Sequence, residues 1–600
     1  MAKKLIKVMD TSFRDGFQSC IGARIFTKDY LPALEAAVNA GIRHFESGGG
    51  ALFQSLVYYA NENPFENMDL VRKTVGDDIE LQTLARGVNL ICLKSQPSDI
   101  VNLHAQLFKK HGVTTIRNFD ALNDVNNLIY SGQCIKNAGL NHEVTITMME
   151  LPPGTTGAAH TAEFYTQTLR KILDSGLPFD RIAYKDASGT SSPQKVYETI
   201  KQARELIGYD IPIRFHSHET AGVSIIAYKA ALDAGADGLD LAMAPLSGGT
   251  CQPDHITMWH ALKGTDYDLG YDINKMIEAE NILKDVLKDY FMPPEATMVN
   301  PMIVFSPLPG GALTANTQMM RDNNVLDKFP QVVEAMTEVV KKGGFGTSVT
   351  PVSQFYFQQA FNNVMFGPWN KIAEGYGKMV LGYFGKTPCE PDNEIVKIAS
   401  EQLKLQPTDK TPLEINDQDP SVGIQAAKKR LIDSGLEATD ENIFISAACE
   451  DKGILFLQGK AHIGVRKNTT VKSNTTTTLE KSDSYTITVN GKKFNISLEG
   501  DTKAKVNGKI YDISVKSGIE SKETDNQSSD STEVKAALPG NVLRINVEEG
   551  DSIEEGDVIL VLEAMKMETE IKSPCSGTVS SIDVSVGNQV NSGQVLVTIN

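Results

Sequence analysis

Short apolar runs alternate with longer helical patterns over the first part of the chain. Eight runs can be counted, and each but the last is clearly followed by a segment long enough for a helix; they span residues 5–10, 42–49, 79–87, 114–124, 143–150, 181–189, 211–219 and 236–244. Strands that alternate with helices are typical of a parallel sheet. Eight such units predict an α/β fold, a (β/α)8 TIM barrel over residues 1–274, rather than an open doubly wound sheet.

Polar residues gather at the carboxyl ends of these runs. They are Asp10, Glu46, Arg86, Asp120, Glu150, Lys185, His216 and His218. In a barrel of this kind the loops that follow the strands converge on one mouth, and enzymes place their chemistry there. The pattern therefore predicts an active site at that mouth.

The remainder of the chain divides by pattern into four parts. Residues 275–466 carry helical periodicity and predict a helical domain, and residues 467–517 show period-2 alternation around Asn-Gly turns, which predicts a small β module. The polar, acidic stretch 518–534 lacks the apolar residues that a core needs, so it predicts a flexible linker. Residues 535–600 contain a repeat: a shift of 37 superposes Gly540 on Gly577 and Val558 on Val595. Two such β halves predict a C-terminal β-sandwich.

Composition narrows the classes of function. The 600 residues carry a net charge of −17, which disfavours nucleic acid and anionic lipid as partners. No apolar stretch approaches the roughly 20 residues that span a bilayer, and no export signal is recognisable at the amino terminus. The 7 cysteines are scattered without metal or disulfide spacing, so we expect a cytoplasmic protein.

Two histidines two residues apart indicate a metal site. His216 and His218 stand at the end of the seventh run, and residues i and i+2 of a strand point to the same side. With Asp15, just beyond the first run, they form a mixed nitrogen and oxygen set suited to a divalent ion. The alternative is a pair of solvent-facing histidines, which the place at a barrel strand end disfavours.

Two lysines are candidates for chemistry. Lys185 ends the sixth run and could be an ion-pair partner, a Schiff-base former or a carbamate that binds metal; the residues alone do not choose. Lys566 lies in EAMKMETE at the junction of the two β halves, where we expect an exposed hairpin tip. A plain solvated lysine is the alternative at that position.

The motifs RDGFQS, KDASG, HSHET and EAMKM together resemble the biotin-dependent carboxyltransferases that act on pyruvate and oxaloacetate. The resemblance covers nearly the whole chain. It implies transfer of a carboxyl group from carboxybiotin, carried by the chain's own biotinyl domain, to pyruvate, giving oxaloacetate. The partners it implies are a separate ATP-dependent biotin carboxylase subunit and a biotin protein ligase. The alternative within the family is an oxaloacetate decarboxylase α subunit that runs the reverse reaction with a sodium-pumping membrane complex.

The resemblance also implies roles for individual residues. One Zn²⁺, Mn²⁺ or Co²⁺ ion would be bound by Asp15, His216, His218 and a carbamylated Lys185, and biotin would be attached to Lys566. The remaining matches are Arg14 and Gln18 near metal and substrate, Arg86 on the pyruvate carboxylate, and Thr350 as the proton shuttle. Members of the family are commonly dimers or larger, so we expect a homo-oligomer.

Three positions weigh on the competing interpretations. Phe17 stands where the family usually has histidine, and Leu93 where a tyrosine often lies beside the substrate arginine. These departures are the support for a carrier scaffold whose barrel has lost catalysis. Glu219, after the second histidine, argues against the acyl-CoA metallolyases, which typically carry asparagine there.

Overall fold

The computed structural model describes residues 3–155, 157, 159–468, 484–489, 492–498, 503–506, 509–512, 532–536, 540–564, 567–591 and 593–600. The chain forms two compact units, Met1–Asn468 and Thr469–Asn600, which are considered separately below. Lys566 and residues 518–531 of the predicted linker lie outside the described residues.

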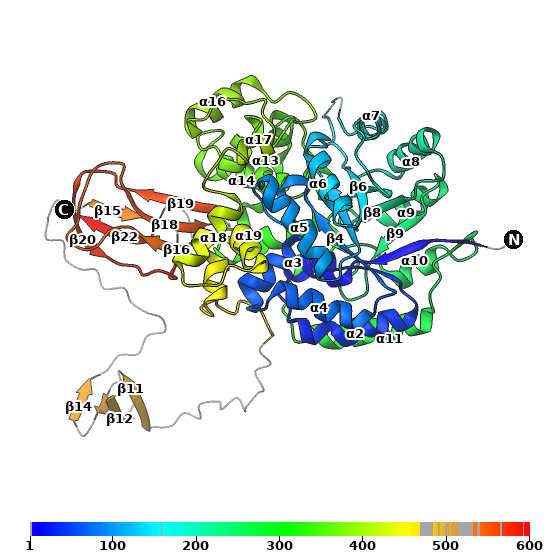
Figure 1. Ribbon diagram of the computed structural model, residues 1–600. Helices are drawn as coiled ribbons and strands as arrows, with labels where there is room; N and C mark the ends of the chain where they lie inside the picture. The colour runs from blue at the N-terminus through cyan, green and yellow to red at the C-terminus, as the bar shows by residue number, and fades with distance from the viewer. Residues whose placement is uncertain are drawn as a thin grey trace. The chain divides into compact units, whose positions relative to one another are not determined.

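The first unit contains a closed barrel of eight parallel strands (Figure 1). Its strands pair in chain order and the last closes on the first: β2 (Lys7–Asp10), β3 (His44–Glu46), β4 (Glu80–Ala85), β5 (Thr115–Phe119), β6 (Asn141–Thr147), β7 (Arg181–Asp186), β8 (Ile213–Ser217) and β9 (Gly238–Leu241). Every one of the eight predicted runs contains or overlaps one of these strands. The barrel prediction is confirmed, although the strands are shorter than the runs, because the polar ends of the runs leave the sheet and form the mouth.

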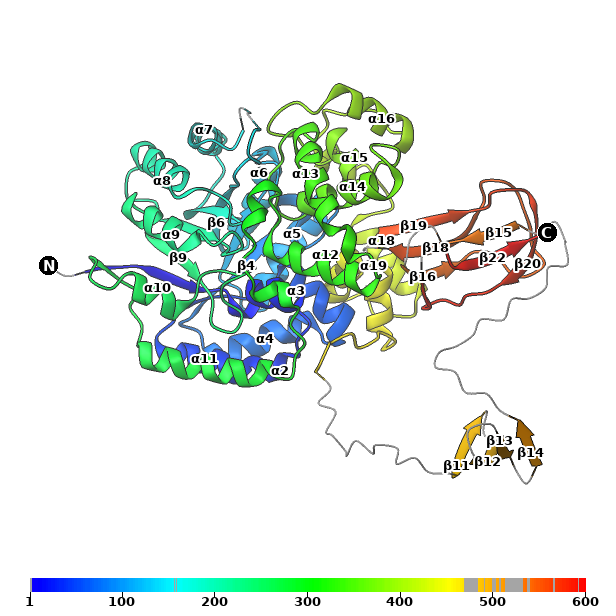
Figure 2. The same cartoon turned by 180° about the vertical axis from the view of Figure 1, so that it is seen from behind.

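Helices surround the barrel and bury its outer face (Figure 2). They are α2 (Thr27–Ala40), α4 (Pro64–Val75), α5 (Ser98–Lys110), α6 (Asn126–Asn137), α7 (Ala162–Asp174), α8 (Pro193–Ile207), α9 (Ser224–Asp233) and α10 (His255–Ala261). Several begin at a side chain that accepts a hydrogen bond from the first turn, such as Ser192 for α8 and Asp254 for α10. Small strands β1 (Lys4–Leu5) and β10 (Tyr267–Asp268) pair beside the barrel.

Short helical turns follow several strands at the mouth. They are η1 (Ser12–Gly16), α1 (Phe17–Ile21), α3 (Gly50–Ser55), η2 (Leu56–Ala60) and η3 (Gly87–Asn89). Both η1 and η2 are π-helical turns, a form that is rare and often found at functional sites. The first of them carries Asp15.

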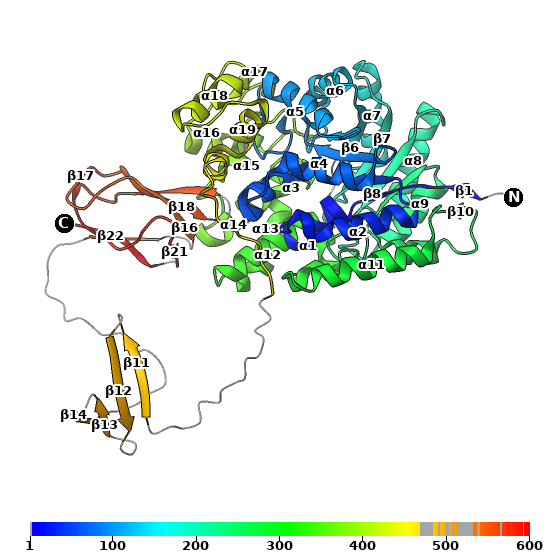
Figure 3. The same cartoon turned by 60° about the horizontal axis from the view of Figure 1, so that its bottom comes forward.

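Residues beyond the barrel are helical in this unit. They form α11 (Ile273–Leu287), η4 (Pro294–Thr297), η5 (Pro301–Phe305), α12 (Gly310–Asp322), η6 (Leu326–Lys328), α13 (Phe329–Lys342), α14 (Val352–Phe366), α15 (Glu374–Val380), α16 (Asn393–Leu403), α17 (Pro412–Asn416), α18 (Gly423–Asp433) and α19 (Asp440–Leu457). Helix α11 runs beside α2 (Figure 3) and shares the hydrophobic cluster of the barrel. The boundary at residue 274 stays a prediction.

The second unit contains strands only, within the residues described. An antiparallel sheet is formed by β11 (Ser484–Val489), β12 (Lys492–Leu498), β13 (Lys503–Val506) and β14 (Lys509–Asp512). Two further four-stranded sheets are formed by β15 (Thr532–Lys535), β16 (Gly540–Ile545), β17 (Ser552–Ile553), β18 (Val558–Ala564), β19 (Met567–Lys572), β20 (Gly577–Ile582), β21 (Gln589–Val590) and β22 (Val595–Ile599). Across the described residues of both units, we find no helix long and apolar enough to cross a membrane.

Candidate active site

A pocket lies at the carboxyl ends of the barrel strands. Its walls come from the barrel and from the helical region, and they include Arg14, Asp15, Gln18, Arg86, Lys185, His218, Ala312 and Thr350. Of the described residues to which the resemblance assigns a role, every one except His216 lines this pocket, and His216 contacts Lys185 and His218. The other polar residues expected at the mouth do not line it: Asp10, Glu46, Asp120 and Glu150. The structure therefore brings the barrel residues implied by the family resemblance to one site.

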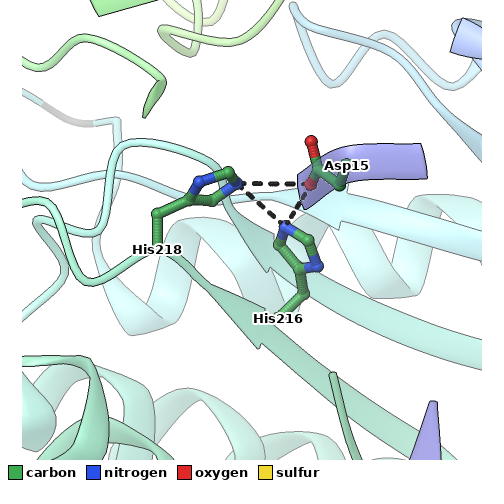
Figure 4. A group of neighbouring side chains, drawn as sticks. All are labelled: Asp15, His216 and His218. Carbon is green, nitrogen blue, oxygen red and sulfur yellow. Dashed lines mark hydrogen bonds and ion pairs between the residues drawn. The ribbon is translucent and has the colours of Figure 1, made fainter. Parts of the chain in front are cut away.

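Asp15, His216 and His218 converge on one point (Figure 4). Asp15 Oδ2 lies 3.4 Å from Nε2 of each histidine, and the two Nε2 atoms are 3.2 Å apart. Metal bonds of about 2.0–2.1 Å in tetrahedral geometry place two ligand atoms about 3.3 Å apart. The three side chains thus already have the spacing that a tetrahedrally bound divalent ion requires.

The second nitrogen of each histidine is held by a hydrogen-bond acceptor. His216 Nδ1 lies 2.8 Å from Asp240 Oδ2, and His218 Nδ1 lies 2.7 Å from the carbonyl oxygen of Thr250. These acceptors keep the proton on Nδ1, so Nε2 presents its lone pair. Burial, with the charge of Lys185, lowers the pKa of His216 well below its usual range and keeps the imidazole neutral. Both features favour metal binding.

Asp15 is held in its ionised form. Burial opposes its charge, but the charges of Arg14 and Lys185 hold the pKa of the carboxyl well below its usual range. Arg14 Nη1 donates to Oδ1 at 3.2 Å, so the other oxygen, Oδ2, faces the histidines. Arg14 in turn is paired with Glu46 at the end of β3. The carboxylate is therefore oriented as a ligand.

Lys185 lies near the end of strand β7, inside the same group. Its Nζ lies 2.9 Å from His216 Nε2 and 3.7 Å from Asp15 Oδ2. Burial lowers the pKa of this amine to about 8 because desolvation penalises the ammonium form. An ammonium group here would repel a divalent cation, whereas a carbamate would attract it.

Arg86 and Gln18 also line the pocket. Arg86 is buried, and its Nη1 donates to the carbonyl oxygens of Ile91 at 2.5 Å and Cys92 at 3.2 Å. Burial lowers its pKa to about 10, so the guanidinium remains charged at neutral pH. Gln18 Oε1 accepts from Arg14 Nη1 at 3.1 Å. These groups offer fixed donors to a small anion.

Thr350 reaches the pocket from the segment that precedes α14. Residues of this segment are tied to the barrel: Thr347 N donates to Ala121 O at 2.8 Å, and Thr147 Oγ1 donates to Thr347 Oγ1 at 2.8 Å. The carbonyl oxygen of Phe345 lies 2.7 Å from Nε2 of the buried His160. The hydroxyl of Thr350 is thus carried by a segment with fixed anchors.

The two departures from the family pattern fall outside the pocket wall. Phe17 is fully buried with its ring 5.0 Å from Tyr30 and 5.9 Å from Phe13, under the helical layer. Leu93 is half-buried beside the turn that holds Arg86. Neither departure falls on a proposed metal ligand.

Three buried residues of the site carry no motif that marks them in sequence. Asp240 and Gln252 contact the histidines, and Thr11 contacts Gln252. An acidic residue inside the apolar run ADGLDLAMA is the signal that could have found Asp240. For the other two there is no such signal, because polar residues near a strand end are common.

Two family models match the chain. One, described as a conserved carboxylase domain, matches residues 303–498, and one described as a biotin-requiring enzyme matches residues 532–599. The B subunit of pyruvate carboxylase from Methanocaldococcus jannaschii is 32% identical over 574 residues, which cover 94% of each chain. The chain belongs to this family of biotin-dependent carboxyltransferases. It is an enzyme with a C-terminal biotinyl domain.

Further comparisons agree on this carboxyltransferase. The B subunit of pyruvate carboxylase from Methanothermobacter thermautotrophicus is 29% identical over 572 residues, again 94% of each chain. The fold is similar to the carboxyl transferase domain of Rhizobium etli pyruvate carboxylase, solved with pyruvate and biocytin: the TM-score is 0.69 at 22% identity, over 86% of this chain and 89% of that one. The family expected from the four motifs is confirmed.

Proposed function

We propose that this carboxyltransferase moves a carboxyl group from carboxybiotin to pyruvate and so forms oxaloacetate. The observation that carries the proposal is the pocket that Arg86, Thr350, Asp15 and His218 line, with His216 in contact with His218. Both archaeal relatives bear the name of the carboxylating enzyme, which supports this direction over the oxaloacetate decarboxylase alternative.

The metal centre is part of this proposal. Asp15, His216 and His218 would hold one Zn²⁺ or Mn²⁺ ion, with Co²⁺ as a substitute, and a carbamate on Lys185 would complete the set. The charge of a bound divalent ion supports the carbamate. Nζ of Lys185 lies 3.7 Å from Asp15 Oδ2, where an anionic carbamate would attract the ion and an ammonium group would repel it. A bound divalent ion would stabilise negative charge on the oxygen of a keto acid.

Residues of the chain itself perform the remaining steps. Arg86, which lines the pocket, binds the carboxylate of pyruvate, because a guanidinium matches a carboxylate in shape and charge. Arg14 and Gln18, which are hydrogen-bonded to each other, orient the keto group. Thr350 takes a proton from the methyl group of pyruvate and returns it to the nitrogen that gives up the carboxyl group. One carbon–nitrogen bond and one carbon–hydrogen bond are thereby exchanged for one carbon–carbon bond and one nitrogen–hydrogen bond.

Lys566 is the proposed attachment point for biotin. The support is the match of residues 532–599 to a biotin-requiring domain and the position of Lys566 between β18, which ends at Ala564, and β19, which begins at Met567. A biotin protein ligase would join the carboxyl group of biotin to Nζ as an amide. Peptide mass spectrometry should find biotin on Lys566 alone.

A separate ATP-dependent biotin carboxylase subunit is the proposed partner, since the relatives are named as B subunits. A cytoplasmic homo-oligomer is also proposed, on the scattered cysteines and the family resemblance. The proposed domains are the barrel 1–274, the helical domain 275–466, the β module 467–517, the linker 518–534 and the biotinyl domain 535–600.

The proposed function is tested by substrate dependence. Biotinylated chain, combined with a biotin carboxylase, ATP and bicarbonate, should form oxaloacetate from pyruvate and leave the longer 2-oxoglutarate unchanged. Arg86→Gln should lose most activity by losing the carboxylate contact, while the exposed Arg43→Gln should not. Carboxylation of 2-oxoglutarate in preference to pyruvate would contradict the substrate assignment.

A further inference from the structure

Gln252 lies in the loop between β9 and α10, and its side chain contacts the proposed metal-ligand group, Asp15, His216 and His218. Its Nε2 lies 3.0 Å from Asp15 Oδ2, 3.0 Å from His218 Nε2 and 3.3 Å from His216 Nε2. These are the same three atoms whose spacing fits a divalent ion. One amide nitrogen therefore contacts every member of the group.

The other end of the Gln252 amide is anchored. Thr11 Oγ1 lies 2.6 Å from Gln252 Oε1, and Cys251 Sγ lies 3.1 Å from the same oxygen. Gln252 and Thr11 are both fully buried. Because Gln252 Oε1 accepts from Thr11 and Cys251, Nε2 faces the ligand group, and these two contacts fix the orientation of the amide.

The three ligand atoms are all hydrogen-bond acceptors. Asp240 and the Thr250 carbonyl hold the histidine protons on Nδ1, and Asp15 Oδ2 accepts from Gln252 Nε2. Acceptors 3.2–3.4 Å apart repel one another unless a donor or a cation lies among them. The two N–H groups of Gln252, with the Lys185 amine 2.9 Å from His216 Nε2, supply that donor.

We propose that Gln252 is a positioning residue of the metal centre, whose amide holds Asp15, His216 and His218 at tetrahedral spacing before the cation binds. The inference rests on the proposed metal function. Groups around metal ligands typically contribute about 10–100-fold to metal affinity because they fix ligand orientation. The opposite role, a donor that only competes with the cation for lone pairs, predicts tighter binding when the amide is removed.

The test is a cobalt titration of the full chain, followed by visible absorption. In Gln252→Met, which keeps length and volume, the dissociation constant for Co²⁺ should rise by about 10–100-fold. In Gln252→Glu, a fourth acceptor replaces the donor, so the melting temperature of the metal-free protein should fall and cobalt should restore it by more than it raises the wild type. The matched control is Gln359→Met: Gln359 is equally buried and hydrogen-bonded, but lies in α14 and contacts Lys371 and Ala373 instead.

Thr11→Val gives a second variant that leaves both Gln252 and the ligands in place. It removes the hydroxyl that anchors Gln252 Oε1 and should weaken cobalt binding several-fold, less than Gln252→Met does. Wild-type affinity in Gln252→Met and Thr11→Val, or tighter binding in either, would overturn the positioning role while the metal centre stands. A wild-type chain that binds no cobalt in the same titration would overturn the metal centre and the inference together.

Discussion

The metal-ligand group and the two biotinyl sheets are built in opposite ways. The group, Asp15, His216 and His218, and the residue that contacts it come from distant parts of the chain: Asp15 and Gln252 are in contact although 237 positions separate them. In the biotinyl sheets, strands β16 to β22 pair within residues 540–599. The metal-ligand group therefore forms only in a complete barrel, whereas the biotinyl sheets depend on local turns and one repeat.

The repeat is visible in the structure down to its irregularities. Strands β16 and β20 start 37 residues apart, at Gly540 and Gly577, and each has a register shift at the equivalent place, after Val542 and after Val579. The buried core is shared equally, since Val542, Ile553 and Leu560 are matched by Val579, Val590 and Val597. A local change here should therefore have small effects that are the same in both halves, whereas a change in the barrel site should have large effects.

The largest effect is expected for His216→Ala. This substitution removes one of three ligand atoms and leaves Asp240 and Lys185 without their shared partner. We expect loss of bound metal and of carboxyl transfer, with the fold retained. Metal content by mass spectrometry and activity with pyruvate check this.

The exposed His462→Ala is the control for His216→Ala, because it removes an imidazole outside the barrel site. Unchanged metal content in His216→Ala would contradict the assignment of His216 as a metal ligand.

A smaller loss is expected at Thr350. Thr350→Val keeps the branched shape but removes the hydroxyl, and general acid–base groups typically contribute about 10²–10⁴-fold. Carboxyl transfer should fall by that factor in Thr350→Val and be largely retained in Thr350→Ser. If the residue only stiffens the segment before Pro351, the order of the two variants is reversed.

Much of the barrel and of the biotinyl sheets could be predicted from sequence. The eight apolar runs located the barrel, because strand periodicity is a local signal. The 37-residue spacing located the biotinyl strands for the same reason. The His216–His218 pair pointed to the cluster that these histidines form with Asp15, and the role of that cluster as a metal site stays a prediction. Lys566 lies outside the described residues, so its exposed position stays a prediction.

Other parts could not be predicted, because they depend on which strands close the barrel. Asp240 and Gln252 become part of the site only when β9 pairs with β2 and brings the loop after it beside Asp15. The anchoring of Thr350 depends on contacts between the segment before α14 and the ends of β5 and β6, such as Thr147 with Thr347. No spacing in the chain carries that information.

Asp240→Asn tests a residue that orients a proposed ligand, His216, and is not itself a ligand. Asp240 accepts from His216 Nδ1 and from Arg117 at 2.5 Å, and Arg214 Nη1 lies 3.2 Å from its other oxygen. The amide keeps the shape but can present a donor to His216 Nδ1, which disturbs the tautomer. We expect metal affinity to fall about 10–100-fold. Isothermal titration with Mn²⁺ measures it.

Asp237→Asn is the matched control for Asp240→Asn. Asp237 immediately precedes strand β9 and pairs with Arg204, away from the histidines. An equal loss of metal affinity in both variants would assign the effect to barrel stability instead of ligand orientation.

The smallest effects are expected in the biotinyl turns, where Gly550 and Gly587 are equivalent positions of the repeat with φ of 98° and 88°. A side chain would meet no atom within 4 Å at either position, so alanine costs only the strain of positive φ, about 1–2 kcal/mol. Gly550→Ala and Gly587→Ala should thus lower the stability of these sheets by similar amounts and leave metal binding unchanged. Hydrogen exchange of peptides from residues 540–600 in the full chain measures both, and Gly550→Asn should cost less because asparagine tolerates this backbone better. Markedly unequal losses would show that the two halves differ in stability although they share one pattern, and the local account of this unit would then be incomplete.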